Sequence, residues 1–348
     1  MKVSIGYNEI KGPFGGGINF SRQLKNFLKK NGIEVISDLD SDNIDIILLT
    51  EPRRYTQSSA FNHLDVIDYL KNTNKEAIVV NRINECDERK NTKGLNQFLI
   101  NSSDVADHTV FISNWLLELF IKQGFSKEQF SIIRNGADEK YFFSNQIKQK
   151  PKKFKIVTHH WGASQNKGIK AYKEIDRLLD NDDFKNNFEF TFIGNLPSNV
   201  QFNNCRVLDP MDQMELSNFL RECHIYITGS ENEPAGMHHI EGAMSGLPIL
   251  YLESGGITEY CHDYGLSYKI SNLGEKILEI SSNYLEYRKK LDNYIFTGEE
   301  MNKQYLKLFN KLIENKQEIY DNRKHIKKRY LKNQYKFGNK YFYTKNLI

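Results

Sequence analysis

The sequence predicts an α/β protein with two doubly wound, parallel-sheet domains of the Rossmann type that face each other across a cleft, followed by C-terminal helices. Short apolar runs alternate with helical patterns along most of the chain, and such alternation is typical of parallel sheets with helices on both faces. The alternation restarts after a polar stretch near residue 150, which indicates a second domain of the same type. A length of 348 residues is ample for two domains.

The first domain is expected to cover residues 1–148. Apolar runs predict strands at 3–5, 44–49, 77–80 and 110–112. Helical patterns follow at 18–30 and from Ser113 or Asn114 onward, and both of these residues are good N-caps. A turn signal at Asn135-Gly136 precedes the boundary.

The second domain is expected at residues 149–300. Strands are predicted at 154–157, 190–193, 225–227 and 247–251, and helices at 168–179, 214–221 and 237–245. Residues 301–348 are assigned to a basic C-terminal helical segment. Ligands of doubly wound sheets bind at the carboxyl ends of the strands, so we expect a cleft between the two domains there.

Composition excludes some classes of protein. The longest apolar runs, such as 44–49, are far too short to cross a bilayer, and the N-terminus has the pattern of a strand instead of a signal peptide. The four cysteines have no metal-ligand spacing and are expected to be free thiols in a reducing compartment. A cytoplasmic location is therefore expected.

The most informative segment is 228–248, which follows a predicted strand. Pro234 and Gly236 fix a tight loop, and the helix that starts after them presents free backbone N–H groups and a positive dipole end. Such a helix start suits a diphosphate or an array of sugar hydroxyls. Glu233 lies in the loop and Glu241 in the helix, so the two carboxylates can bind vicinal diols in different parts of one extended ligand.

This segment resembles the E-x7-E motif of the retaining family 4 glycosyltransferases, which have the GT-B fold. The stretch 233–236, Glu-Pro-Ala-Gly, matches the family's Glu-Pro-Phe-Gly with Ala in place of Phe. Residues 241–248 match the family's Glu-Ala-Met-Ala-x-Gly-x-Pro, and the turn at 254–259 matches the family's next segment. The alternative is an ordinary strand–loop–helix of a doubly wound fold, which the agreement in spacing, strands and glycines disfavours.

The resemblance implies a donor site in the second domain, an acceptor side in the first, and retention of anomeric configuration. Glu233 would contact the donor sugar near the reacting carbon, and Glu241 would hold the ribose hydroxyls. The N–H groups of Gly236, Met237 and His238 would bind the sugar hydroxyls.

A glycine-rich stretch at 12–17 follows the first strand. Gly16 and Gly17 resemble the Gly-Gly loop that faces the donor in the family. Glycines allow the backbone to approach a phosphate or sugar closely, but a plain turn is an equally good interpretation.

The stretch 159–168 follows the first strand of the second domain. Lys167 matches a lysine of the family and would neutralise the leaving diphosphate, with a solvated surface lysine as the alternative. The arginine that the family also places here is absent. His160, Trp161 or Ser164 would have to substitute for it.

Charged residues are dense at 81–90, after another predicted strand. The family often has a histidine here that touches the donor sugar, whereas this sequence has Asn84 and Glu85 in an Arg-x-Asn-Glu pattern that resembles a variant subgroup. Glu85 or Asp87 could orient an acceptor hydroxyl or act as a base, and a capped solvent loop is an equally good interpretation. We take Asn84 and Glu85 as catalytic candidates beside Glu233.

The histidine pairs at 159–160 and 238–239 suggest a metal site, but adjacent histidines point different ways on a helix and no i, i+4 pair exists. The Asp-x-Asp-x-Asp stretch at 38–42 is interpreted as a solvated loop. We expect neither a metal nor another cofactor, with the nucleoside diphosphate sugar bound as a substrate.

The net charge of +4 is unevenly distributed. Residues 316–348 contain ten Lys and Arg against two Asp and Glu, a balance of +8, so residues 1–315 carry −4. This tail, which includes several aromatic residues, has three interpretations: a terminal helix that packs back on the first domain as in similar enzymes, a peripheral contact with an anionic membrane that bears a lipid-linked acceptor, or, least favoured, a nucleic-acid contact.

The sequence thus predicts a metal-independent retaining glycosyltransferase of glycan biosynthesis. It would move a hexose from a nucleoside diphosphate sugar to a hydroxyl acceptor, whether a glycan, a lipid-linked molecule or another. One alternative is a nucleotide-sugar epimerase of the same architecture, and another is a nucleic-acid or surface-binding protein that uses the basic tail. Base recognition is expected around residues 208–211.

Overall fold

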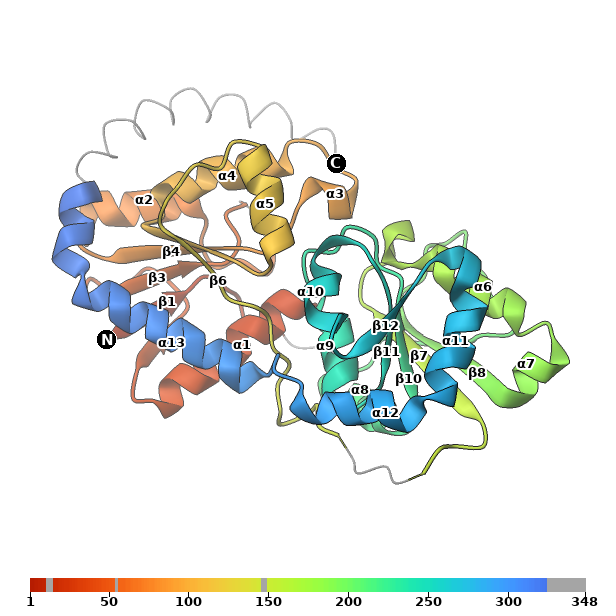
Figure 1. Cartoon of the computed structure of the whole chain (residues 1–348). Helices are drawn as coiled ribbons and strands as arrows, with labels where there is room; N and C mark the ends of the chain where they lie inside the picture. The colour runs from red at the N-terminus through yellow and green to blue at the C-terminus, as the bar shows by residue number, and fades with distance from the viewer. Residues whose placement is uncertain (11–14, 54–55, 145–148, 324–348) are drawn as a thin grey trace.

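The computed structural model describes residues 1–10, 15–53, 56–144 and 149–323, and it contains two sheets that lie side by side (Figure 1). Each sheet has six strands, in the orders β2-β1-β3-β4-β5-β6 and β12-β11-β10-β7-β8-β9. The paired strands are parallel throughout, and helices flank both sheets. The predicted fold class, with two doubly wound parallel-sheet domains, is confirmed.

The first domain is built around the first sheet. Its strands are β1 (Lys2–Ile5), β2 (Glu34–Ile36), β3 (Ile46–Leu49), β4 (Ile78–Ile83), β5 (His108–Phe111) and β6 (Phe130–Ile132). Its helices are α1 (Gly16–Lys30), α2 (His63–Asn72), α3 (Asp87–Lys90), α4 (Leu95–Ser102) and α5 (Asn114–Lys122), with a short 3-10 turn at Ser103–Val105. Ser113 caps α5, because its side chain accepts a hydrogen bond from the N–H of Leu116.

The second domain repeats this plan. Its strands are β7 (Phe154–His160), β8 (Phe188–Gly194), β9 (Arg206–Leu208), β10 (Ile225–Thr228), β11 (Ile249–Leu252) and β12 (Gly265–Tyr268). Its helices are α6 (Ile169–Leu178), α7 (Asp182–Asn187), α8 (Gln213–Arg221), α9 (Met237–Met244), α10 (Thr258–Cys261), α11 (Leu273–Ser282) and α12 (Tyr284–Lys290). Single 3-10 turns lie at Gln165–Lys167, Gly255–Ile257, Ile270–Asn272 and Leu291–Asn293.

The four edge strands were not predicted from the sequence. β2 and β6 are the outer strands of the first sheet, and β9 and β12 are those of the second. Three of them have only three residues each, and their side chains are mostly exposed or half-buried. An edge strand has one neighbour and one open side, so it lacks the continuous apolar run that marks a central strand of a parallel sheet.

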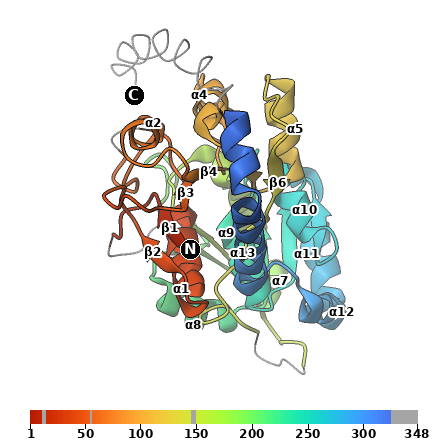
Figure 2. The same cartoon turned by 90° about the vertical axis from the view of Figure 1, so that its left-hand side faces the viewer.

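A long helix, α13 (Gly298–Glu314), returns from the second domain to the first. It packs along α1, as Figures 1 and 2 show. The buried rings of Phe20 on α1 and Tyr305 on α13 lie with centroids 5.3 Å apart, and Phe309 packs beside Tyr305. The domain boundaries at 148 and 300 stay predictions, although this helix begins close to the second of them.

The described chain ends at an ion pair with the first domain. Arg323 is 5% exposed; it pairs with the carboxylate of Asp107 and donates hydrogen bonds to the carbonyl oxygens of Lys75 and Ala77. The basic tail beyond it, residues 324–348, lies outside the described residues. Within the described chain, no helix is both long and apolar enough to cross a bilayer.

Hydrogen bonds join the two domains beside the cleft. The Tyr260 hydroxyl of α10 donates to the carbonyl oxygen of Ile112 and accepts from the N–H of Asn135. The carboxylate of Glu259 accepts the N–H groups of Asn114 and Trp115 at 3.0 and 2.7 Å, so an anion of the second domain occupies the N-terminus of α5. Asn135 and the turn at 254–259 therefore both belong to the junction between the domains.

The packing of α13 leads to a stability prediction. Phe309 is fully buried, so Phe309→Ala should lower the free energy of unfolding by ~3–5 kcal/mol, the usual range for a large aromatic side chain in a core. Asn310→Ala, at an exposed position of the same helix, is the matched control and should change it by less than ~0.5 kcal/mol. Urea unfolding followed by circular dichroism measures both. Equal midpoints for the two variants would show that α13 does not belong to the core.

Candidate active site between the two domains

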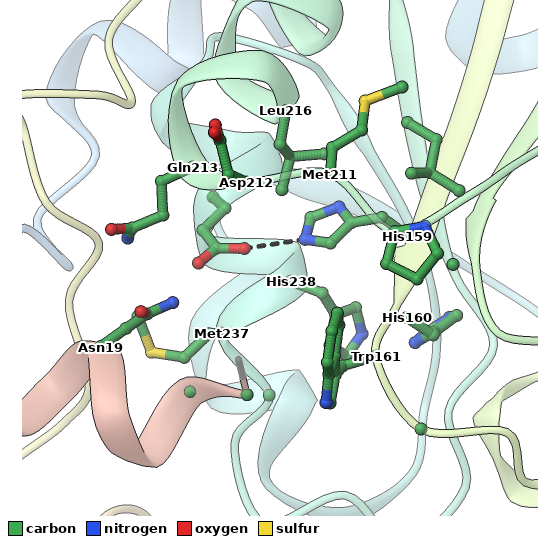
Figure 3. A pocket seen from close by; sticks show the side chains of 18 of the residues that line it. Asn19, His159, His160, Trp161, Met211, Asp212, Gln213, Leu216, Met237 and His238 are labelled. Atoms are coloured by element: carbon green, nitrogen blue, oxygen red, sulfur yellow. Dashed lines mark hydrogen bonds and ion pairs between the residues drawn. The ribbon is translucent and has the colours of Figure 1, made fainter. Parts of the chain in front are cut away.

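A cleft of about 510 Å³ lies between the two domains. The first domain lines it with Gly15, Gly16, Asn19, Arg22 and Arg89, and the linking segment adds Tyr141. The second domain contributes side chains from the carboxyl ends of β7 and β8 and from the loops that follow β9 and β10: His159, His160, Trp161, Gly162, Lys167, Ile193, Gly194, residues 210–214, Leu216, Glu233, Gly236, Met237, His238 and Glu241. Figure 3 shows the labelled ones around the hollow. This is the position where doubly wound sheets bind ligands.

Glu233 lies in the loop between β10 and α9, and the turn at 254–256 fixes this loop. The Ser254 hydroxyl accepts the N–H of Asn232 at 2.8 Å, and the N–H of Gly256 donates to the carbonyl oxygen of Glu233 at 2.9 Å. Gly255 has φ +67°, and a Cβ atom there would lie 2.3 Å from the same carbonyl oxygen, so only glycine fits. The loop conformation therefore depends on a second loop far along the chain.

Glu233 is buried, with 3% of the residue exposed, and its carboxylate lies between two cations. Its Oε1 lies 2.8 Å from Nε of Arg89, which belongs to α3 of the first domain, and its Oε2 pairs with the ammonium group of Lys167. Burial alone would raise the pKa of Glu233, but the charges of Arg89 and Lys167 outweigh this effect and lower the pKa to about 2 from an ordinary value of 4.5. The carboxylate is therefore ionised throughout the physiological range.

Glu241 also faces the cleft, from inside α9. Its Oε2 lies 2.7 Å from Nε2 of His159, the contact drawn as a dashed line in Figure 3. Nδ1 of His159 lies 3.0 Å from the hydroxyl of the buried Tyr226. Tyr226 and His159 thus fix the orientation of the carboxylate. In the sequence, His159 stood out only as part of a histidine pair.

The start of α9 forms the floor between the two carboxylates. Gly236 is the N-cap, and no side chain makes a capping hydrogen bond there, so the first N–H groups of the helix are available to a ligand. A Cβ atom on Gly236 would lie 2.3 Å from the imidazole of His238. A Cβ atom on Gly16 would lie 2.5 Å from Cγ of Met237, so the glycine loop of the first domain reaches the helix start. A Cβ atom on Gly17 would have no neighbour within 4 Å, and Gly17 is not part of the lining.

Only some of the other residues predicted for the site line the cleft. Trp161 lines the cleft and is 41% exposed, whereas Ser164 lies outside the lining and precedes the turn that carries Lys167. Asn84 and Glu85 are also outside the lining. Glu85 lies behind Arg89 and pairs with three cations, at 2.9 Å from Arg53, 3.8 Å from Arg89 and 2.6 Å from Lys90.

Asp87 has a local structural role. Its carboxylate accepts the N–H groups of Leu95 and Asn96 at 3.1 and 3.0 Å and the hydroxyl of Thr92 at 2.7 Å. These contacts fix the start of α4. The candidates in the 81–90 stretch, Asn84, Glu85 and Asp87, therefore stand behind the cleft wall, and the residue that reaches the cleft is Arg89.

The histidines of the cleft are tied to polar side chains of the second domain. Nε2 of His160 lies 2.5 Å from the Tyr172 hydroxyl, and Nε2 of His238 lies 2.8 Å from the Thr228 hydroxyl. Burial lowers the pKa of both imidazoles well below the ordinary value, so both are neutral. Across the ranges that the structure describes, no three His, Cys, Asp or Glu side chains gather as a metal site.

The far wall of the cleft is the loop between β9 and α8. Pro210, Met211 and Asp212 line it, next to the stretch expected to recognise a base. Oδ1 of Asp212 accepts the N–H groups of Met214 and Glu215 at 2.8 and 2.9 Å, so this carboxylate caps α8. Recognition of the base by this loop stays a prediction.

Comparison with known proteins agrees with this architecture. The chain is similar in structure to HepE of Anabaena in complex with UDP-glucose (13% identity, TM-score 0.64), covering 90% of this chain and 100% of that one. It is also similar to sucrose-phosphate synthase from Thermosynechococcus elongatus (12% identity, TM-score 0.63, 90% and 99% covered) and to a glycosyltransferase from Rickettsia africae (15% identity, TM-score 0.62, 90% and 98% covered). Among curated proteins, no sequence relative matches.

The two parallel sheets with their flanking helices have the GT-B fold of these structures. Residues 139–298 match the family model described as "Glycosyl transferases group 1", a family of retaining hexosyltransferases. The resemblance found in the sequence is confirmed. Sugar transfer from a nucleotide-sugar donor is the activity of this family.

The low pKa of Glu233 predicts how stability depends on pH. At pH 7, Glu233→Gln should lower the free energy of unfolding by ~3–5 kcal/mol, because it removes the anion that Arg89 and Lys167 share and leaves the buried Lys167 ammonium without its ion-pair partner. A carboxyl whose folded pKa is depressed stabilises the protein fully above its unfolded pKa, and this contribution is lost as the pH falls toward the folded pKa. The difference between wild type and variant should therefore be constant from pH 8 to about 5 and shrink between 4.5 and about 2.

Urea midpoints at a series of pH values measure this difference. Glu231→Gln is the matched control, because Glu231 lies in the same loop and makes a more exposed ion pair with Lys170 at 3.3 Å. A difference that already shrinks between pH 8 and 6 would contradict the assignment of Glu233 as an ionised, cation-bound group.

Proposed function

We propose that this protein transfers a hexose from a nucleoside diphosphate sugar to a hydroxyl group of an acceptor. The observation that carries the proposal is the buried Glu233 carboxylate, which faces the cleft between two cations at the start of α9. The similar HepE protein was obtained with UDP-glucose bound, which supports a donor of this class. In our proposal the donor sugar lies near Glu233 and the base lies toward Pro210 and Met211.

The two carboxylates have separate tasks in this proposal. Glu233 has a pKa of about 2, so it is a permanent anion that accepts hydrogen bonds from sugar hydroxyls and stabilises positive charge at the reacting carbon; it is not suited to donate a proton. Glu241 is oriented by His159 through one oxygen and offers its other oxygen to the ribose diol. They are not an acid and base pair.

Departure of the nucleoside diphosphate requires positive charge near the leaving oxygen. Lys167 lies in the cleft wall, and the start of α9, whose first N–H groups have no side-chain cap, lines the same cleft. These groups are fixed before the reaction, so they stabilise the developing phosphate charge without reorganisation. The scheme needs no metal ion.

A donor-hydrolysis screen tests the proposal. Purified protein is incubated with UDP-, GDP-, ADP-, CDP- and dTDP-linked hexoses without acceptor, and the products are analysed by chromatography. We expect slow release of one nucleoside diphosphate, and Glu233→Gln should reduce this rate by about 10²–10³-fold, the range for loss of one preorganised electrostatic group. Glu231→Gln should retain the wild-type rate.

Each outcome separates the hypotheses. Conversion of the sugar nucleotide to its epimer without release of the nucleotide would favour an epimerase instead. Neither turnover nor binding of any donor would contradict the proposal. All variants are assayed at a temperature at which circular dichroism shows them folded, because Glu233 also contributes to stability.

The third hypothesis, a binding protein that uses its basic tail, needs a truncation that respects the fold. Removing all residues after Asn315 would also remove Arg323 and leave the buried Asp107 carboxylate without its partner. A chain that ends at Arg323 avoids this defect. If that truncated protein keeps donor hydrolysis at the wild-type rate, the tail is not part of the catalytic site, whereas loss of hydrolysis would place it there.

A further inference from the structure

Two basic residues of the cleft, Arg22 and Arg89, come from the first domain, and Arg89 is the one that contacts Glu233. The loop after β7 holds a single basic residue, Lys167, between residues 161 and 168. The family pattern has a second cation in this loop, and no residue of this loop supplies it. Arg89 of α3, in the first domain, lies in the cleft wall and contacts the same carboxylate as Lys167.

The geometry places the two cations side by side. Arg89 meets Oε1 of Glu233 at 2.8 Å, and Lys167 meets Oε2 of the same carboxylate. The charge of Glu233 raises the pKa of Arg89, so the guanidinium stays protonated. Both cations also line the cleft, so they add positive potential to its wall.

The backbone around Arg89 is docked onto the second domain. The Asn166 side chain donates a hydrogen bond to the carbonyl oxygen of Arg89 at 3.3 Å, and Sγ of Cys86 lies 3.8 Å from the carbonyl oxygen of Asn232. Asn166 precedes Lys167, and Asn232 precedes Glu233. The α3 segment thus rests on the two loops that carry its ionic partners.

A second carboxylate, that of Glu85, also pairs with the guanidinium. It lies 3.8 Å from Arg89 and is itself held by Arg53 and Lys90. Burial alone would raise the pKa of Glu85, but these three cations lower it, which makes Glu85 a weak base. We therefore assign it as a positioning residue for Arg89 and not as a catalytic base.

We propose that Arg89 is a donor-binding residue that supplies, from the first domain, the second cation for the diphosphate of the donor. A guanidinium binds phosphate oxygens in bidentate fashion, and a diphosphate carries enough charge to engage both cations beside Glu233. Because Arg89 and Lys167 belong to different domains, the diphosphate site is complete only when the domains are closed. This inference rests on the proposed function.

Isothermal titration calorimetry with UDP and UMP as probes tests the assignment. Arg89→Gln should weaken UDP binding by about 10–100-fold, the effect of losing a charge-assisted hydrogen bond, and UMP binding, which lacks the second phosphate, by less than about 3-fold. The UDP affinity of Arg89→Lys should lie between those of wild type and Arg89→Gln, since lysine keeps the charge but loses the bidentate geometry of the guanidinium. Lys93→Gln, at an exposed position after α3, is the control and should bind as wild type does.

The outcomes distinguish this inference from the proposed function. If wild type does not bind UDP, then GDP, ADP, CDP and dTDP are titrated with their monophosphates, and failure of all of them would overturn the proposed donor class. If wild type binds a diphosphate and both Arg89 variants bind it equally well, or lose diphosphate and monophosphate affinity in parallel, Arg89 is a structural link and only this inference fails. Arg89→Lys keeps the ion pair with Glu233, so it decides the question should Arg89→Gln not fold.

Discussion

The organisation of the cleft depends on one buried carboxylate between two cations. Glu233 belongs to the second domain, Lys167 to another loop of that domain, and Arg89 to the first domain. A buried charge is tolerated only when it is paired, so these three side chains constrain each other and the loops that carry them. Several other features keep these three side chains together: the glycines at 255 and 256, the short helix α3, and the hydrogen bond from Asn166 to the backbone of Arg89.

Much of the fold could be predicted from the sequence, and the omissions have a common cause. The eight strands that were predicted are the inner strands of the two sheets, where side chains on both faces are buried and apolar runs are continuous. The four omitted strands are the edges, which have mixed exposure. Each of them forms because it pairs with a neighbouring strand, and the local sequence does not show where that strand lies.

The residues of the candidate site also fall into those that the sequence predicts and those that it does not. Glu233, Glu241 and Lys167 could be found because a local motif surrounds each of them, and all three line the cleft. His159 and Arg89 depend on tertiary contacts, with Glu241 and Glu233 respectively. The dense charges at residues 81–90 correctly indicated that this segment lies near the site. The sequence alone does not show which of these side chains contacts the other domain. It favours Glu85, whereas the structure shows that Arg89 makes this contact.

The contact of Glu259 with the N-terminus of α5 has a consequence for protein engineering. The Glu259 carboxylate of the second domain accepts free N–H groups at the start of α5 in the first. The neighbouring Tyr260 donates a hydrogen bond to the carbonyl oxygen of Ile112, which lies between β5 and α5. A chimera that takes its donor half from a relative would keep this joint only if both halves supply matching partners. Residues 112–115 and 257–260 should therefore be exchanged together, as one cassette, whenever donor specificity is transplanted.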